Sequence, residues 1–160
     1  MKPDKFNEAS EREIEELLTR YPTKQAALLP VLHLAERDFG WISPDVMELV
    51  ARRLEISPAH VYGVATFYTM YEKEPRAKYH VEVCQTLPCA IMGCGRLIEY
   101  LEKKLGIKTG EKTKDERFKL TKVECLASCG TGPAMRINET YYENLTDAEI
   151  DRILEELNKA

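Results

Sequence analysis

Apolar residues in the first half of the chain recur every three or four positions, which is the spacing of one face of an α-helix. Ser10 opens a capping-box pattern at the first such stretch, and a second helical stretch covers residues 23–39. Ser43 and Ser57 are each followed by proline, a pair that suits a helix cap and the first helical position. The pattern therefore predicts helices throughout the first half.

The last of these helices, expected over residues 59–71, is apolar around most of its circumference. Its valine, phenylalanine, tyrosine and methionine side chains leave no continuous polar side for water. We expect this helix to be buried, either between other elements or under a partner protein.

The periodicity changes from helical to strand-like after a charged stretch at residues 72–78 that contains a proline. An alternating apolar and polar pattern then begins at Tyr79 and leads directly into Cys84. The change predicts a boundary between a helical domain, residues 1–75, and a second domain, residues 76–160.

The second half alternates between strand and helix patterns. Beyond Cys84 the pattern predicts a helix, a strand that begins at Phe118, a hairpin around Asn138, and a final helix capped by Thr146. The resulting order, β-α-β-β-β-α, indicates an α+β (α/β) domain preceded by a helical extension. A strand, helix, strand unit favours a parallel pair, which brings the loops after both strands to one edge of the sheet.

Composition and charge exclude several classes of protein. The 160 residues carry 23 Lys and Arg against 27 Asp and Glu, so there is no diffuse basic field for nucleic acid. The longest nearly apolar run, residues 26–35, is far shorter than the roughly 20 residues that a membrane-spanning helix needs. The charged N-terminus is unlike a secretory signal. We expect a cytoplasmic protein that does not insert into a membrane.

The cysteines are the most informative residues, because five of them without an export signal do not suggest disulfides. All lie in the second half of the chain: Cys84, Cys89, Cys94, Cys125 and Cys129. Cys94 falls in register with Ile91 and Ile98 on the expected helix, so we expect it to pack in the core. The other four cysteines lie in loops after two strands and are the candidate metal ligands.

Two metal centres use four thiolates. Structural zinc usually takes pairs of C-x2-C spacing, whereas the spacings here are x4 and x3, which favours a longer [2Fe-2S] cluster and leaves zinc as the alternative. A Rieske centre needs interleaved histidines, and a thiol-disulfide enzyme needs C-x-x-C; the sequence has neither. Gly130 and Gly132 are expected to take positive φ and to let backbone N–H groups approach sulfur.

Four segments together resemble the small [2Fe-2S] subunits of the NADH dehydrogenase module of respiratory complex I, an NADH:quinone oxidoreductase. They are VATFYTMY at residues 64–71, the Cys84-x4-Cys89 pair, ECLASC at residues 124–129 and YYENLT at residues 141–146. The resemblance covers nearly the whole chain and implies a thioredoxin-like ferredoxin domain after a helical extension. It places the ligands of one [2Fe-2S] cluster on Cys84, Cys89, Cys125 and Cys129, and no catalytic residue in this chain.

The resemblance also implies a partner, a subunit that binds NADH, FMN and its own iron-sulfur cluster. This chain would exchange single electrons with that flavin, as a peripheral part of an inner-membrane complex. The chain lacks a complete G-x-G-x-x-G fingerprint, so NADH and FMN are expected only in the partner. We expect the helical half, and residues 59–71 above all, to help hold that partner. Three alternatives are the equivalent subunit of an NAD-linked hydrogenase or formate dehydrogenase, a stand-alone ferredoxin that carries electrons by diffusion, and a zinc-stabilised interaction module without redox activity. A stand-alone ferredoxin would leave about 70 residues of helix before the cluster domain unexplained.

Overall fold

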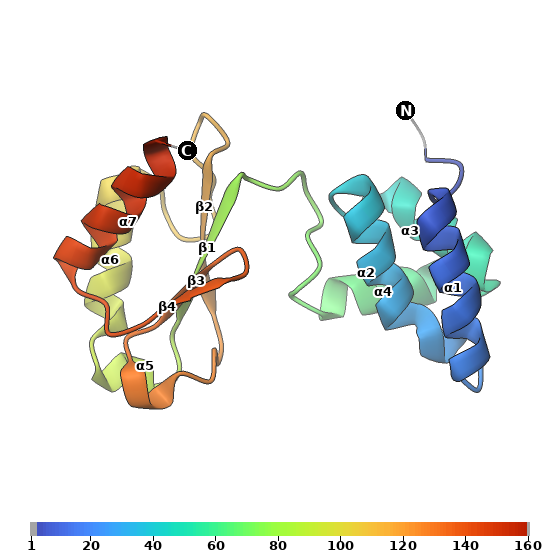
Figure 1. Cartoon of the computed structure of the whole chain (residues 1–160), viewed down its shortest axis with the longest axis horizontal. Coiled ribbons are helices and arrows are strands. Elements are labelled where there is room, and N and C mark those ends of the chain that lie inside the picture. Colours follow the sequence, from blue (N-terminus) through green and yellow to red (C-terminus); the bar gives the residue numbers. More distant parts are fainter. Residues whose placement is uncertain (1–2, 160) are drawn as a thin grey trace. The chain divides into compact units, whose positions relative to one another are not determined.

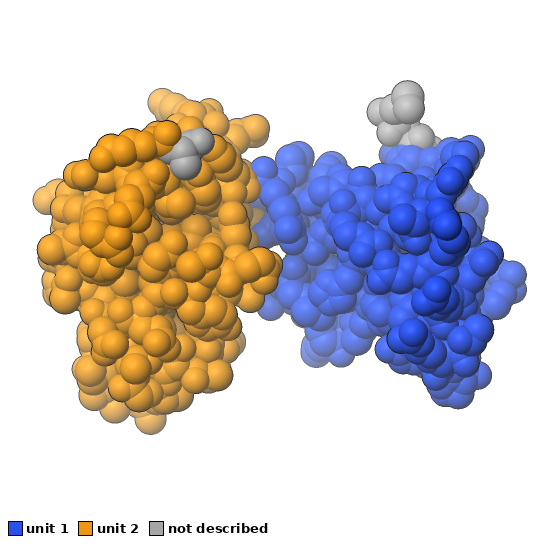
Figure 2. Space-filling view, viewed as in Figure 1, with its two compact units in different colours: residues 1–76 blue, residues 77–160 orange. Residues whose placement is uncertain are grey.

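The computed structural model describes residues 3–159 of the chain. It consists of two compact units, residues 1–76 and residues 77–160, which Figure 2 distinguishes by colour. Each unit has its own hydrophobic core, one built from helices alone and the other from a sheet with helices.

The described part of the first unit, residues 3–76, is built from four α-helices (Figure 1) and one short 3-10 helix. Their bounds are α1 Glu8–Arg20, η1 Gln25–Ala27, α2 Leu28–Phe39, α3 Pro44–Leu54 and α4 Pro58–Phe67. Apolar faces of all four α-helices meet in one core, in which Ile14, Leu32 and Leu54 are fully buried. The helices that the sequence predicts for this half are confirmed.

The first helix begins earlier than its capping-box pattern predicts. Asn7 is the cap, and its side-chain oxygen accepts a hydrogen bond from the backbone N–H of Ser10 at 2.8 Å. The Ser10 hydroxyl instead donates to Asp38 at 2.7 Å, which joins α1 to α2. Ser43 does cap α3, as predicted, by accepting the N–H of Val46.

The α4 helix is shorter and less buried than its sequence predicts. It ends at Phe67, and Tyr68 is already extended, so the expected continuation to residue 71 is wrong. Val61 and Ala65 face the core, whereas the Phe67 side chain is 77% exposed. One side of α4 therefore lies outside the core of the first unit.

A buried carboxylate holds the segment that follows α4. One oxygen of Glu36 accepts the backbone N–H of Glu72 at 2.7 Å, and the other pairs with Arg76 at 2.9 Å. The hydroxyl of Tyr71 donates to the carbonyl of Leu29 at 2.9 Å. Burial and the nearby Glu36 carboxylate raise the pKa of Tyr71 to about 12. These bonds fix the end of the first unit against α2.

The second unit is a four-stranded sheet with helices (Figure 1). Its elements are β1 Tyr79–Cys84, α5 Leu87–Ile91, α6 Cys94–Leu105, β2 Phe118–Val123, η2 Cys129–Thr131, β3 Met135–Ile137, β4 Thr140–Tyr142 and α7 Asp147–Lys159. The strand order is β2-β1-β3-β4, with β1 and β2 parallel and the other pairs antiparallel. The predicted element order and the parallel pair are both confirmed.

The helix expected after Cys84 is broken in two. Gly93, at φ 91°, occupies the left-handed region that favours glycine, and it separates α5 from α6. Because of this break, Ile91 does not continue the apolar stripe of α6 and is 75% exposed. Leu97 and Leu101 of α6 are fully buried, and α6 packs against β1, β2 and α7.

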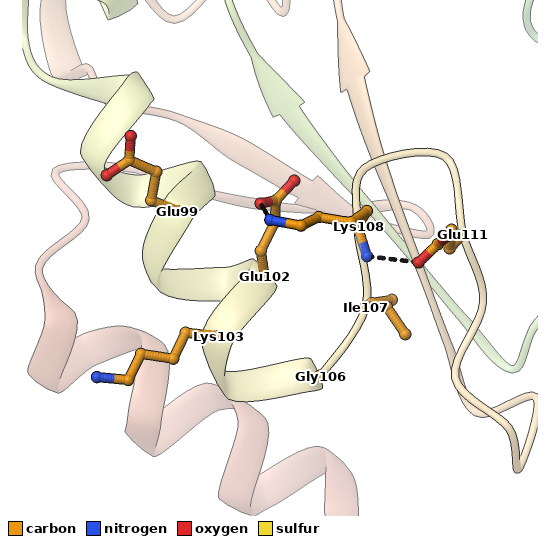
Figure 3. A pocket seen from close by; sticks show the side chains of 7 residues that line it. All are labelled: Glu99, Glu102, Lys103, Gly106, Ile107, Lys108 and Glu111. Atoms are coloured by element: carbon orange, nitrogen blue, oxygen red, sulfur yellow. Dashed lines mark hydrogen bonds and ion pairs between the residues drawn. The ribbon is translucent and has the colours of Figure 1, made fainter.

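The chain leaves α6 through a loop that an acidic side chain organises (Figure 3). Glu102 accepts hydrogen bonds from the Lys108 ammonium group at 2.8 Å and from the backbone N–H of Thr109 at 3.0 Å. These contacts lower the pKa of Glu102 to about 2. The adjoining pocket is lined by charged and aliphatic residues of α6 and this loop and includes no cysteine.

No helix within residues 3–159 is both long enough and apolar enough to cross a membrane.

Candidate metal centre

The sheet brings both cysteine segments to one edge. Cys84 is the last residue of β1, and its register partner in the neighbouring parallel strand β2 is Val123. The next residue, Gln85, donates its backbone N–H to the carbonyl of Val123 at 3.0 Å. The chain segments that carry Cys89 and Cys125 therefore leave the sheet side by side, as the predicted parallel pairing requires.

The four candidate thiols differ in exposure. Cys84, which is 2% exposed, and Cys89 in α5 are buried, whereas Cys125 and Cys129 lie in the loop after β2 and are exposed. The thiols of Cys84 and Cys89 contact each other. The structure thus brings one pair together in the interior and sets the other pair at the surface of the same unit.

Hydrogen-bond donors surround the buried thiol at the end of β1. The Thr86 hydroxyl lies 3.3 Å from Cys84 Sγ. Burial by itself would raise the pKa of Cys84, but the Thr86 hydroxyl and the backbone N–H groups of Leu126 and Thr86 outweigh it and lower this pKa. Because Leu126 follows Cys125 directly, this contact joins the two cysteine segments.

The loop after β2 reaches the second buried thiol as well. A Cβ atom built on Gly132 would lie 3.5 Å from Cys89 Sγ. Burial and the adjacent Cys84 raise the pKa of Cys89, and the backbone N–H of Ala134 acts in the opposite sense. The exposed thiol of Cys125 has its own donor, the backbone N–H of Ala127 at 3.2 Å.

The glycines of this loop do not behave as the sequence predicts. Neither Gly130 nor Gly132 has positive φ, and Ala127, at φ 60°, is the left-handed residue between the two cysteines. The donors that face the thiols belong to Thr86, Leu126, Ala127 and Ala134. Sequence reasoning missed them because a backbone N–H carries no residue signature.

Cys94 begins α6 and is buried in the core together with Leu97 and Ile98. Burial and the nearby Cys84 raise the pKa of its thiol. A neutral thiol in an apolar environment suits packing, so the expectation that Cys94 fills space in the core fits its place in the structure.

Within residues 3–159, no three His, Cys, Asp or Glu side chains already converge as a ready-made site for a metal ion. The donor chemistry nevertheless fits an iron-sulfur cluster, because four thiols from two adjacent segments are available at one sheet edge. The surrounding N–H and hydroxyl donors suit cluster sulfur, which accepts hydrogen bonds from its protein environment.

Comparisons with known proteins point to the same kind of centre. Residues 14–158 match the family model of the thioredoxin-like [2Fe-2S] ferredoxins. The E subunit of the NADH-quinone oxidoreductase of Rickettsia prowazekii is 42% identical over 145 residues, which cover 89% of this chain and 82% of that protein. NADH-quinone oxidoreductase subunit 2 of Thermus thermophilus is also 42% identical, over 88% of this chain and 80% of that protein.

Solved structures share the fold. A chain of an NAD+-reducing [NiFe]-hydrogenase superposes with a TM-score of 0.73 over 83% of this chain, at 22% sequence identity. The match covers 23% of that longer chain. At this identity the likeness shows the fold alone. The family model and the 42% identical relatives go further: the chain belongs to the thioredoxin-like [2Fe-2S] ferredoxin family and is similar to proteins named as subunits of NADH-quinone oxidoreductase.

Proposed function

We propose that this chain is the [2Fe-2S] electron-transfer subunit of an NADH:quinone oxidoreductase, with one cluster held by Cys84, Cys89, Cys125 and Cys129. The observation that carries the proposal is the meeting of two cysteine segments at the end of the parallel β1–β2 pair, with N–H donors directed at sulfur. The family match supports a [2Fe-2S] cluster over zinc.

The cluster, when bound, supplies a site that accepts and returns one electron at a time. The protein's part is to hold and shield it. Cys84 and Cys89 provide buried thiols, and Cys125 and Cys129 provide exposed ones from the segment after β2. The Leu126 and Ala134 N–H groups stabilise negative charge on the thiolates, because each lowers the pKa of the thiol that it faces.

The redox partner in this proposal is a separate subunit that binds NADH and FMN and exchanges single electrons with this chain. The relatives' name, NADH-quinone oxidoreductase, supports that role. Through that complex the chain would attach peripherally to the inner membrane. We favour this role over the hydrogenase or formate dehydrogenase counterpart, because the hydrogenase likeness shows the fold alone.

In this proposal the chain has two domains with different roles. The helical domain, residues 1–75, helps to bind the partner, and the ferredoxin domain, residues 76–160, holds the cluster. Large apolar side chains on α4 and just after it are exposed, namely Tyr62, Phe67, Tyr68 and Met70. An exposed apolar group of this kind is typical of a protein interface. In this proposal α4 contributes to binding of the flavin subunit.

The test is electron transfer from NADH in the presence of the flavin subunit. NADH should reduce the cluster of this chain when both subunits are mixed, and should leave it oxidised when the flavin subunit is omitted. Electron paramagnetic resonance of the reduced cluster reports the transfer. If NADH fails to reduce the cluster although dithionite does, the proposed role is wrong.

A variant separates binding from cluster assembly. Phe67→Ala removes an exposed ring and should weaken co-purification with the flavin subunit while iron content stays at the wild-type level. Tyr141→Ala is the matched control, because Tyr141 is an exposed aromatic residue of the other unit. Equal binding by wild type and Phe67→Ala would exclude Phe67 from the interface.

A further inference from the structure

Thr86 lies at the N-terminal end of a helix, where a threonine side chain usually caps the helix. It is the N-cap residue of α5, with extended backbone at φ −71° and ψ 166°. An N-cap threonine normally accepts a hydrogen bond from the N–H of the second or third residue of its helix. The second residue here is Pro88, which has no N–H, and the Thr86 side chain makes no capping hydrogen bond.

The hydroxyl of Thr86 is directed at sulfur instead. It lies 3.3 Å from Cys84 Sγ, within the range for a hydrogen bond to sulfur. Cys84 is 2% exposed and Thr86 is half-buried, so water competes little for this contact. In such an environment a hydrogen bond is electrostatically stronger than in water.

The direction of the hydrogen bond follows from the chemistry of the ligand. A free thiol could donate or accept, but a metal-bound thiolate has no proton and only accepts. The Thr86 hydroxyl must then be the donor. Its bond adds to those from the N–H groups of Thr86 and Leu126, which face the same sulfur.

We propose that Thr86 is a positioning residue that donates its hydroxyl hydrogen bond to Cys84 Sγ and thereby raises the reduction potential of the cluster. This inference rests on the proposed function, because it takes Cys84 as a ligand. Reduction adds one electron, supplied in the test by a chemical reductant, and increases the negative charge on the thiolates. No covalent bond forms or breaks, and the hydroxyl keeps its proton.

The hydrogen bond favours the reduced state because it is stronger when the sulfur is more negative. Its loss should therefore lower the equilibrium constant for reduction several-fold. A tenfold decrease corresponds to a shift of about 59 mV for a one-electron couple. A residue that acted only on folding would change thermal stability and leave the potential where it was.

The experiment compares full-length wild type with Thr86→Val and Thr86→Ser, all loaded with iron and sulfide. A redox titration followed by electron paramagnetic resonance gives each midpoint potential. Thr86→Val, which keeps the shape but loses the hydroxyl, should have the lower potential. Thr86→Ser, which keeps the hydroxyl, should stay near wild type. If Thr86→Val does not retain a cluster, Thr86→Ala gives the same comparison with a smaller side chain.

Thr146→Val is the matched control. The Thr146 hydroxyl accepts the N–H of Glu149 at 3.3 Å at the start of α7, so this variant removes a real helix cap in the same unit. It should lower thermal stability without moving the potential. An unchanged potential in Thr86→Val, or an equal fall in Thr86→Ser, overturns the proposal.

Three failures remain distinguishable. If wild type itself holds no iron and sulfide, the proposed function is wrong. If wild type holds the cluster and Cys84→Ser keeps it unchanged, the ligand assignment is wrong. If wild type contains the cluster and Cys84→Ser perturbs it, but the Thr86 variants do not change the reduction potential, only the role of Thr86 is wrong.

Discussion

Each unit is stabilised by its own core of buried apolar side chains, but the two cores differ in composition. The helical unit buries hydrocarbon and aromatic side chains, and its sequence up to residue 76 contains no cysteine. The core of the second unit includes three thiols, Cys84, Cys89 and Cys94, the first of them at the end of a parallel strand pair. Packing and internal polar contacts such as those of Glu36 account for the buried residues of the first unit, whereas the three thiols of the second also require a chemical explanation.

Both units also expose apolar residues, and the positions differ in meaning. In the helical unit most of the large ones lie on α4 or just after it, remote in sequence from any cysteine. In the second unit Leu87, Ile91 and Met92 lie beside Cys89 in sequence. The first group suits the binding of a partner, and the second flanks the candidate centre itself.

The largest effect is expected when the candidate ligand thiols of the second unit are replaced. Serine at any one of Cys84, Cys89, Cys125 or Cys129 should perturb or abolish the cluster, because a hydroxyl is a poorer ligand for iron than a thiolate. Cys94→Ala should keep the cluster and lower the free energy of unfolding by about 1–2 kcal/mol, as a small buried group is removed. Visible absorption and iron content measure the difference. Loss of the cluster specifically in Cys94→Ala would contradict the ligand set.

A second pair of variants tests whether the two cores are independent. Leu32 in the helical unit and Leu101 in the second unit are both fully buried, and alanine at either should cost about 2–5 kcal/mol. Leu101→Ala should lower the temperature at which the cluster absorption disappears. Leu32→Ala should lower helix melting by circular dichroism and leave the cluster absorption in place. Equal loss of cluster in both variants would mean that the units unfold as one.

A smaller effect is expected at the carboxylate of the helical unit. Glu36→Ala leaves the buried N–H of Glu72 without its acceptor, and such a loss costs about 1–3 kcal/mol. Glu15→Ala is the control, because Glu15 is exposed on α1. Denaturant unfolding compares the two. Similar midpoints for both variants would show that Glu36 does not stabilise the end of the unit.

The smallest effect concerns pH. The folded-state pKa of Glu102 is about 2, below its ordinary value of 4.5, so its ionised form stabilises the second unit. This contribution is fully present above about pH 4.5 and is lost as the pH falls toward 2. Glu102→Gln should therefore melt at a lower temperature than wild type at pH 7, and the gap should close in acid. A gap that stays constant with pH would be inconsistent with this role.

Sequence periodicity predicted the larger elements of both units because it reflects burial, which is a local pattern along the chain. The strands that end at Cys84 and near Cys125, and their parallel pairing, follow from such patterns. The break at Gly93 does not, since Ile91, Cys94 and Ile98 match a single helical stripe equally well. The left-handed conformation of Gly93 separates the two helices, and this conformation depends on how the two flanking segments pack.

The sequence predicts the candidate thiols of the centre but not the hydrogen-bond donors around them. Cysteine spacing and the expected sheet edge select four of the five cysteines, and the structure places the segments that carry them after the adjacent parallel strands β1 and β2. That these four hold a cluster stays a prediction. The N–H groups of Leu126 and Ala134 depend on loop conformation, which no residue type specifies. Ala127 rather than either glycine adopts positive φ, although residue type alone favours glycine there.

The most direct test of the central claim is the iron and acid-labile sulfide content of the anaerobically purified protein, with electron paramagnetic resonance before and after dithionite. A [2Fe-2S] centre requires two irons and two sulfides per chain and a signal that appears only on reduction. A protein that contains zinc, without colour or sulfide, would contradict the account.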